Sequence, residues 1–405
     1  MGIVERPEQL AAIEPFVGAP MVKVLTGMRR AGKSTVLRMV ASRLKESLGA
    51  DRVIELDFDA LAFSPLTDGA RLKTHLDEAM AEPGGYAVFL DEVQEVDGWE
   101  KVVNSLLAEG RCDIYVTGSN SKLLSSELAT YIAGRYVAHE VRTLSFAEHL
   151  DFAKHLGATA DVNAEFERFL RWGGFPGTRV APLGDDDVYR AVRDIYNSAL
   201  LRDVLHRKAI RNPDMLERLA AFALDTTGSV VSAASIARYL RSQNRKIDPD
   251  TALGYVSALS EAYIVNKCHR YDIQGKQRLA VHEKYYPGDH GLLSAVLGPS
   301  ALRLPGTLEA VVWAELRRRG WTLGVGKWGD AEVDFVAEKD GARVYYQVTT
   351  AFANNAETLR RELRPLQAIP DSYPKRVLSM EPVALPLEGG IEHFRIPDFL
   401  LDKSL

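Results

Sequence analysis

The chain has 405 residues, of which 46% are apolar and 26% charged, and its net charge is −5. At about 150 residues per domain this length predicts two to four domains, and the composition excludes a disordered chain, a collagen-like fibre and a coiled-coil rod. No apolar run of about 18 residues occurs, so we expect no membrane-spanning helix. The start of the chain lacks the features of a signal peptide, and the only cysteines are Cys112 and Cys268. We therefore expect a cytoplasmic protein without disulfides or a cysteine-rich zinc site.

The first 145 residues alternate between strand and helix patterns. Strands are predicted at 22–25, 53–57, 86–90 and 112–117, and helices at 34–48 and 99–108. Strands that alternate with helices indicate a parallel sheet covered on both faces, which places this part in the α/β class.

After residue 145 the pattern becomes mainly helical and then mixed. Helices are predicted at 146–156, 164–172, 185–224, twice within 232–259, at 308–319 and at 356–366, with a hairpin ending at Tyr286, several later strands and a short final strand. We expect four parts: a P-loop core at 1–145, a helical lid or linker at 146–205, a third part at 206–290 and an α/β part at 291–405.

The segment after the first strand matches the pattern G-x-x-x-x-G-K-[ST] in the required strand–loop–helix context. Such a loop turns its backbone N–H groups toward phosphate, and the helix that follows favours an anion. Lys33 would neutralise the β- and γ-phosphates and Ser34 would bind Mg²⁺. The candidate nucleotide-binding residues are Gly27, Met28, Arg29, Arg30, Ala31, Gly32, Lys33, Ser34 and Thr35.

Two carboxylates follow the buried strand at 86–90. We expect Asp91 to hold Mg²⁺ together with Ser34, and Glu92 to polarise the attacking water. Ser119 and Asn120 end the next strand, where a polar side chain helps to place that water; the sequence does not choose between them.

Several motifs together resemble a large family of prokaryotic AAA-type ATPases. They are Thr26–Thr35, Leu90–Gln94, Thr117–Ser119, Gly134–Tyr136, Leu144–Glu148, Trp172–Pro176, Tyr285–Gly291 and Glu332–Phe335. The resemblance implies ATP as the nucleotide, a winged helix and a nuclease-like domain after the ATPase core, and a homo-oligomer in which Arg135 reaches the neighbouring subunit's γ-phosphate. A surface or salt-bridged Arg135 is the alternative.

The third part has the spacing of a winged helix. Ser232–Leu240 and Asp248–Leu259 read as a helix-turn-helix and the following hairpin as the wing. Residues 201–290 alone carry an excess of positive charge, but residues 250–257 of the second helix contain no Arg or Lys. The basic side chains lie on the flanks and suit phosphate contacts: Arg241, Arg245, Lys246, Lys267, Arg270, Lys276 and Arg278. Binding to DNA and use for protein contacts alone both remain open.

The last part resembles the PD-(D/E)XK nuclease core. Glu309 is expected on a helix, Glu332 and Asp334 on a strand, and Gln347 on the next strand. Gln347 replaces the second acid and Thr349 replaces the lysine, which weakens Mg²⁺ binding and removes charge stabilisation. We expect a degenerate nuclease-like fold without cleavage, with Lys327 as the substitute lysine in the alternative. His139 and His206 are expected to serve packing.

Three functional hypotheses follow. The first is a Mg²⁺-dependent ATPase whose turnover rearranges the C-terminal module, with DNA as a candidate partner. The second is a nucleotide-gated switch or assembly protein with little turnover. The third is an ATP-controlled nuclease.

Overall fold

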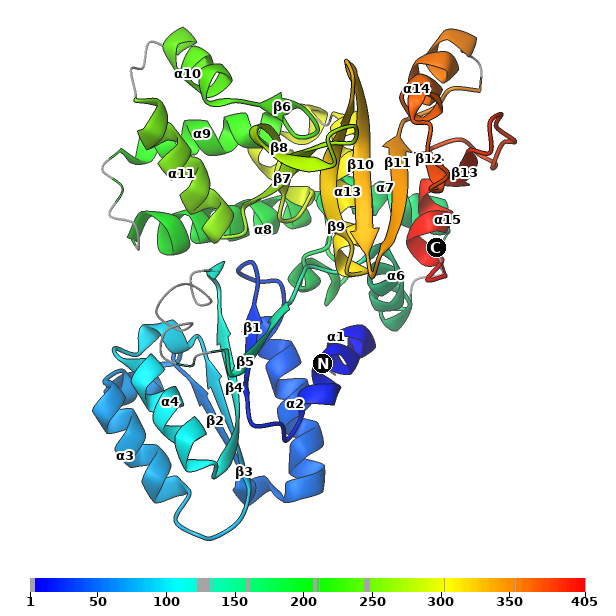
Figure 1. The fold of residues 1–405 in the computed structure, drawn as a ribbon. Helices are drawn as coiled ribbons and strands as arrows, with labels where there is room; N and C mark the ends of the chain where they lie inside the picture. The colour runs from blue at the N-terminus through cyan, green and yellow to red at the C-terminus, as the bar shows by residue number, and fades with distance from the viewer. Residues whose placement is uncertain are drawn as a thin grey trace. The chain divides into compact units, whose positions relative to one another are not determined.

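The structure is a computed structural model that describes residues 4–404 apart from 122–131, 133, 158–160, 207–209, 211, 244–247, 302 and 354. The chain divides into two compact units, Met1–Arg142 and Thr143–Leu405. Each unit has its own sheet and its own hydrophobic core (Figure 1).

Unit 1 is built on a five-stranded sheet in the order β2-β3-β4-β1-β5, and all four strand pairs are parallel. Helices cover both faces of this sheet (Figure 1). The strands are β1 (Val22–Thr26), β2 (Val53–Asp57), β3 (Tyr86–Asp91), β4 (Cys112–Gly118) and β5 (Tyr136–Glu140), and the helices are α1 (Pro7–Ile13), α2 (Lys33–Leu48), α3 (Gly69–Ala79) and α4 (Trp99–Glu109).

Strand β3 shows why the sequence forms a central strand there. All of its residues are buried. Ala87 and Phe89 join the core under α1 and α2, whereas Val88 and Leu90 join the core under α3 and α4. Because side chains alternate between the two faces of a strand, an unbroken apolar run is what a strand covered on both sides requires. The α/β parallel sheet and its first four strands are confirmed.

Strand β5 was not predicted. It lies at the edge of the sheet and contains His139 and Glu140, and all its residues are half-buried or exposed. An edge strand of this kind lacks the apolar run that marks β3 in the sequence.

Unit 2 contains an eight-stranded mixed sheet in the order β13-β12-β11-β10-β9-β7-β8-β6. The segments 206–290 and 291–405, expected as separate domains, both contribute strands to it, because β7 pairs in parallel with β9. The strands are β6 (Val230–Val231), β7 (Val265–Asp272), β8 (Gln277–Pro287), β9 (Thr322–Trp328), β10 (Ala331–Lys339), β11 (Ala342–Val348), β12 (Lys375–Ser379) and β13 (Glu392–Arg395).

Helices cover both faces of this second sheet as well. Helix α13 packs on one face with α6, α7 and α15, and α14 packs on the other. The helices of the unit are α6 (Phe146–His155), α7 (Val162–Trp172), α8 (Asp185–Ser198), η7 (Ala199–His206, a π-helix), α9 (Pro213–Asp225), α10 (Ala233–Ser242), α11 (Pro249–Glu261), α12 (Gly291–Leu297), α13 (Leu304–Arg318), α14 (Ala356–Ala368) and α15 (Ile396–Leu401).

Two expectations about these helices were wrong. The helical run at 185–224 is broken into α8, η7 and α9, and α9 starts anew where the Asn212 side chain accepts a hydrogen bond from the Met215 N–H and Pro213 takes the first turn. The last element is the short helix α15, after β13, and not a strand.

Two glycine motifs of unit 2 form a single clasp. The Asp289 carboxylate accepts hydrogen bonds from the backbone N–H of Gly174 (2.9 Å) and of Gly291 (2.8 Å). A Cβ on Gly174 would lie 2.4 Å from the Leu144 carbonyl oxygen, and one on Gly173 would lie 1.8 Å from the Asp289 carboxylate. The motifs at 172–176 and 285–291 therefore have a structural explanation, because only glycine permits this close backbone approach.

Candidate nucleotide-binding site

The P-loop runs from the end of β1 into α2, as predicted. Gly27 has φ of +138° and Gly32 has φ of +100°, and a Cβ on Gly27 would lie 2.2 Å from the Val141 carbonyl oxygen. Arg30 also has positive φ and its side chain is exposed, whereas Arg29 is buried and lies 3.9 Å from Asp59. The two glycines thus permit the tight loop that a phosphate-binding backbone needs.

Lys33 is directed into its own loop. Its side chain is 3% exposed, and its ammonium donates to the carbonyl oxygens of Gly27 and Met28, both at 3.2 Å. Neutral carbonyls are weak partners for a buried ammonium compared with phosphate oxygens. Lys33 thus stands at the position that the motif predicts for a phosphate-binding lysine.

The sheet order brings the predicted magnesium ligands together. Strand β4 lies between β1 and β3, so Thr117 at its end sits between the P-loop and Asp91. The Asp91 carboxylate accepts hydrogen bonds from the hydroxyls of Ser34 and Thr117. Burial raises the pKa of Asp91, and these two bonds oppose the rise. A cation beside this carboxylate would favour its charged form, so the pair fits Mg²⁺.

Glu92 follows at the same edge in a left-handed conformation (φ +53°). Its backbone N–H donates to Thr117 Oγ1 (2.9 Å), its carboxylate accepts from Gln94 Nε2, and its Oε1 lies 3.7 Å from Lys33 Nζ. Thr117 thus bonds to both acids. Its role as their link was missed, because it depends on β4 lying between β1 and β3.

The remaining predicted residues lie at two ends of the sheet. Ser119 and Asn120 are buried and directly follow β4, at the edge that carries the P-loop. Arg135 precedes β5, and its carbonyl pairs with Val22 at the start of β1, so it lies at the opposite edge. The exposed Arg135 guanidinium donates to Asn104 Oδ1 (3.0 Å). Arg135 therefore does not join the site of its own subunit.

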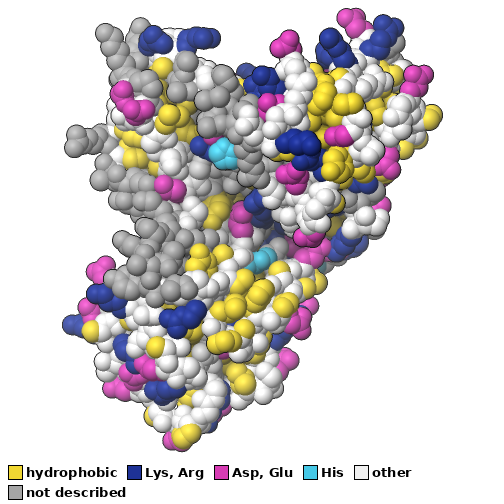
Figure 2. All heavy atoms as spheres, viewed as in Figure 1, with side chains coloured by type: hydrophobic (Ala, Val, Ile, Leu, Met, Phe, Trp, Pro, Cys, Tyr) yellow, Lys and Arg dark blue, Asp and Glu magenta, His cyan; other side chains and the backbone are white. Residues whose placement is uncertain are grey.

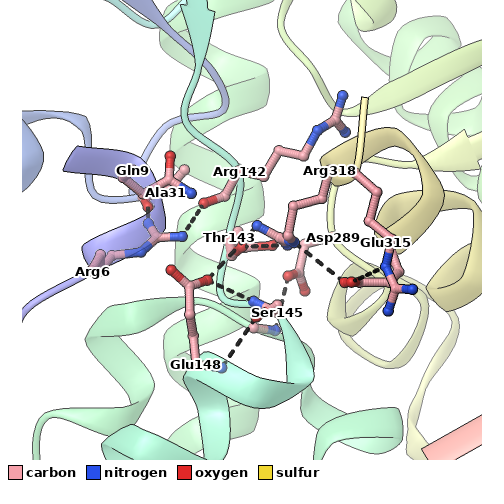
Figure 3. A network of polar contacts seen from close by, with 12 residues as sticks. Arg6, Gln9, Ala31, Arg142, Thr143, Ser145, Glu148, Asp289, Glu315 and Arg318 are labelled. Atoms are coloured by element: carbon pink, nitrogen blue, oxygen red, sulfur yellow. Dashed lines mark hydrogen bonds and ion pairs between the residues drawn. The ribbon is translucent and has the colours of Figure 1, made fainter. Parts of the chain in front are cut away.

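A buried arginine connects the P-loop with the end of unit 1 (Figure 3). Arg6 is 1% exposed; its Nη1 donates to the Ala31 carbonyl (3.0 Å) and its Nη2 to the Arg142 carbonyl (2.9 Å). Unit 2 begins with a similar contact, because Arg318 Nη2 donates to the Thr143 carbonyl (2.9 Å). Two consecutive carbonyls at the boundary between the units are each held by an arginine of their own unit. Arg6 was not predicted.

Helix α6 starts directly after this boundary. Ser145 and Glu148 form a reciprocal capping box at its first turn, with Glu148 also 3.7 Å from Arg318. The Leu144 N–H donates to the Gly174 carbonyl (2.7 Å). Backbone groups of residues 142–145 are thus each hydrogen-bonded within their own unit.

The predicted nuclease-like residues lie together, with one unpredicted lysine among them. Lys284 on β8 is 1% exposed, and its Nζ lies 3.1 Å from Glu309, 2.9 Å from Glu332 and 3.5 Å from Asp334. Burial raises the pKa of Glu309 to about 8. Gln347 lies next to the group, where its Oε1 accepts from the Asp334 N–H (3.4 Å).

The sequence offered Lys327 as an alternative for the missing lysine and did not point to Lys284. Lys327 stands opposite Glu332 in the β9–β10 register, but it is Lys284 that contacts all three carboxylates. Lys284 and Tyr286, two residues apart in β8, point to the same face of the sheet, and the Tyr286 hydroxyl donates to Glu309 (3.1 Å). A lysine two positions from a buried tyrosine was the available signal.

The basic residues of the middle block are only partly available for phosphate. On β7, Lys267 pairs with Glu283 (3.0 Å), and Arg270 lies 3.8 Å from Glu332. Arg241 and Lys276 are exposed. Arg245, Lys246 and the side chain of Arg278 lie outside the described residues, as does the side chain of His206. On the face seen in Figure 2, the described basic and acidic side chains are interspersed.

His139 is half-buried and its Nε2 lies 2.8 Å from Gln9 Oε1. Among the described residues no cluster of three or more His, Cys, Asp or Glu side chains has the arrangement of a metal site. Within the same part of the chain, no helix is long and apolar enough to cross a membrane. Both cysteines are free.

Comparison with known families and structures gives the class of protein to which the N-terminal unit belongs. Residues 19–150 match the AAA domain family, and residues 163–303 match a domain of unknown function, DUF8612. The fold is similar to that of a Walker-type ATPase of Pyrococcus abyssi, with a TM-score of 0.50 at 17% identity, over 73% of this chain and 96% of that one.

The full-length relatives define the family. An uncharacterised protein of Haemophilus influenzae is 31% identical over 403 residues, which cover 98% of this chain and 99% of that protein. An uncharacterised protein of Methanocaldococcus jannaschii is 29% identical over 334 residues, or 78% of this chain and 71% of that protein. The chain belongs to the family of the Haemophilus protein, and its N-terminal unit is an AAA-type P-loop ATPase domain.

Proposed function

We propose that the protein binds ATP with Mg²⁺ and hydrolyses it, and that turnover rearranges unit 2. The observation that carries the proposal is that Asp91 bonds to both Ser34 and Thr117, and that Thr117 also bonds to the Glu92 N–H, beside the Lys33 ammonium. Bound Mg²⁺ would supply charge neutralisation at the phosphates. Ser34 and Asp91 would hold it, Lys33 would bind the phosphates and Glu92 would polarise the water.

The test separates ATP binding from turnover. Lys33→Ala should abolish both, because it removes the cation that the loop directs at the phosphates. Glu92→Gln should keep ATP binding and lower turnover by about 10²- to 10⁴-fold, the usual contribution of a general base. Glu95→Gln, at an exposed acid of the same turn, is the control. Normal hydrolysis by Lys33→Ala would refute the proposal.

A nucleotide-gated switch is the second candidate, and one observation favours it. The Glu92 side chain is held by Gln94 and lies near Lys33, so it must be released before it can act on water. If Glu92→Gln leaves the cellular function intact while Lys33→Ala destroys it, binding alone is the signal.

Arg6 is the proposed route from nucleotide to unit 2. It bonds to one carbonyl inside the P-loop and to one at the last residue of unit 1, so a shift of the loop backbone on ATP binding would move Arg142. Arg6→Lys keeps the charge but cannot span both carbonyls with a planar fork. We expect normal ATP affinity and a loss of the ATP-dependent change in inter-unit distance, measured by spin-label spectroscopy with a non-hydrolysable analogue.

The exposed Arg43 on α2 provides the matched control, as Arg43→Lys. An unchanged distance response in Arg6→Lys would remove Arg6 from the mechanism without touching the ATPase proposal.

We further propose that Arg135 serves a neighbouring subunit in a homo-oligomer, since it is exposed and lies away from its own site. Mixing Arg135→Ala with Lys33→Ala subunits tests this: complementing mixed oligomers would regain turnover, and an Arg135→Ala protein with full activity alone would contradict it.

DNA is a proposed partner of the middle block, through phosphates rather than bases. Arg241 and Lys276 support it, while the ion pairs of Lys267 and Arg270 weaken it. ATP hydrolysis that DNA stimulates and that salt suppresses would support the contact. Hydrolysis indifferent to DNA would direct the search to a protein partner. We also propose, as part of this hypothesis, that unit 2 contains a winged helix and a nuclease-like domain.

A further inference from the structure

The nuclease-like cluster of unit 2 has a cation of its own. Its carboxylates come from two elements, Glu309 from α13 and Glu332 and Asp334 from β10. The Lys284 ammonium lies within 3.5 Å of all three. The register of β10 against β9 shifts between Val333 and Val336, so Asp334 lies in an irregularity of the kind that re-aims a side chain.

The carboxylate oxygens that face the centre already accept protein donors. Asp334 Oδ2 accepts from the Val348 N–H (2.8 Å), and its Oδ1 faces Lys284. Glu309 Oε2 accepts from both Lys284 and Tyr286, each at 3.1 Å. Mg²⁺ requires about six oxygens at about 2.0–2.1 Å, whereas an ammonium donates three hydrogen bonds at the longer distances seen here.

The glutamine that replaces an acid is also engaged. Gln347 Nε2 donates to Glu362 (3.1 Å) while its Oε1 faces the Asp334 N–H. Glutamine can make both contacts because its amide has a donor and an acceptor, whereas an ionised carboxylate has acceptors only. This position therefore supports the backbone of β10 and adds no charge for a metal.

The backbone also restricts access. Gly228 has φ of +77°, and a Cβ there would lie 3.1 Å from the Glu309 carboxylate. Lys284 is 1% exposed and Asp334 is 6% exposed. The Lys284–Asp334 pair is therefore shielded from solvent, and Glu332, with a side chain 33% exposed, is the acid that solvent reaches.

We propose that the Lys284 ammonium is the resident cation of this cluster and takes the place of a divalent metal. The nuclease-like module therefore holds no catalytic metal and does not cleave nucleic acid. The residues do not fit Mg²⁺. Lys284 does not restore the catalytic lysine that Thr349 replaces; its ammonium occupies the position between the acids instead.

The experiment measures Mn²⁺ binding to the full-length, nucleotide-free protein by electron paramagnetic resonance. Without nucleotide the P-loop offers Mn²⁺ only Ser34 and Asp91, and Asp91→Asn subtracts that contribution. We expect no Asp334-dependent Mn²⁺ binding by the wild-type protein. Lys284→Met should gain one Mn²⁺ site, with an affinity at least about tenfold higher than that of the same cluster in the wild type. Asp334→Asn in the Lys284→Met background should remove this site.

Lys327→Met is the matched control, because it removes a β9 lysine that stands opposite Glu332 but for which the described structure gives no ion pair with the three acids. Mn²⁺ bound by the wild type and lost in Asp334→Asn would overturn the proposal, as would Mn²⁺-dependent nicking lost in Lys284→Met. These wild-type measurements decide the question even where Lys284→Met fails to fold. A folded Lys284→Met protein that gains no metal would also overturn it.

Discussion

The two units each place a buried lysine beside strand-end acids, but with different partners. Lys33 donates to two neutral carbonyls and lies 3.7 Å from one carboxylate, while Lys284 lies within 3.5 Å of three carboxylates. A buried charge must be compensated, and the compensating group decides what the site can do. In unit 1 two of these partners are neutral carbonyls, which we propose that phosphate oxygens replace; in unit 2 all three are side-chain acids.

The largest expected effect comes from exchanging the two lysines for methionine. Lys284→Met leaves the buried Asp334 and the partly buried Glu309 and Glu332 without their cation, and we expect unit 2 to lose about 3–5 kcal/mol of unfolding free energy. Lys33→Met should cost about 2–5 kcal/mol of ATP binding free energy and little stability. Denaturant unfolding and ATP titration of both variants check this.

The informative result is that one variant loses stability and the other loses ATP binding. If Lys284→Met were as stable as the wild type while it bound ATP normally, the carboxylates would have found other compensation and the contrast between the sites would fail. If Lys33→Met instead unfolded unit 1, its carbonyl contacts would be structural rather than held ready for phosphate.

The P-loop site could be predicted almost completely from the sequence, because its residues are close in sequence or follow adjacent strands. Gly27 to Ser34 form one loop, and Asp91 ends a strand whose apolar run was plain. Thr117 was missed because its role depends on the strand order, which places β4 between β1 and β3. Its contribution comes from a relation between strands that a linear pattern does not carry.

The second cluster was only half predictable, for a related reason. Glu309 and Asp334 were named from a motif, but Lys284 precedes both in the chain, on a strand that no motif connects with them. Arg6 was missed in the same way: its partners, Ala31 and Arg142, are 25 and 136 residues away. Long-range contacts to backbone carbonyls leave no side-chain signature in the sequence.

A smaller effect tests the part of unit 1 that the sequence missed. Thr117→Val keeps the shape but removes the hydroxyl that bonds to Asp91 and to the Glu92 N–H. A buried polar group left without its partner costs about 1–3 kcal/mol. We expect turnover to fall about 5- to 150-fold with ATP binding largely kept.

The exposed Thr74 on α3, which donates only to the Ala70 carbonyl of its own helix, is the control as Thr74→Val. Equal turnover in wild type and Thr117→Val would mean that Asp91 and Glu92 are positioned without the link through Thr117.

The last expected effect is a pH dependence of the stability of unit 2. Burial and the nearby Asp334 carboxylate raise the pKa of Glu309 from 4.5 to about 8, against the charge of Lys284 and the Tyr286 hydrogen bond. The folded state therefore keeps a proton that the unfolded chain releases. The stability from this group is complete below pH 4.5 and is lost as pH rises toward 8, by up to about 1.4 kcal/mol per pH unit.

Other groups contribute unfolding free energy with the opposite pH dependence. The difference in unfolding free energy between two proteins therefore isolates the contribution of Glu309. Burial lowers the pKa of His149 to about 2, which removes stability as pH falls below 6.5 in wild type and variant alike. Unfolding free energies of the wild type minus those of Glu309→Gln should thus decline from pH 5 to pH 8. A flat difference would mean that Lys284 holds Glu309 ionised across this range. The cluster would then carry three full negative charges. The single positive charge of Lys284 would leave a net negative charge, which would attract a divalent metal ion.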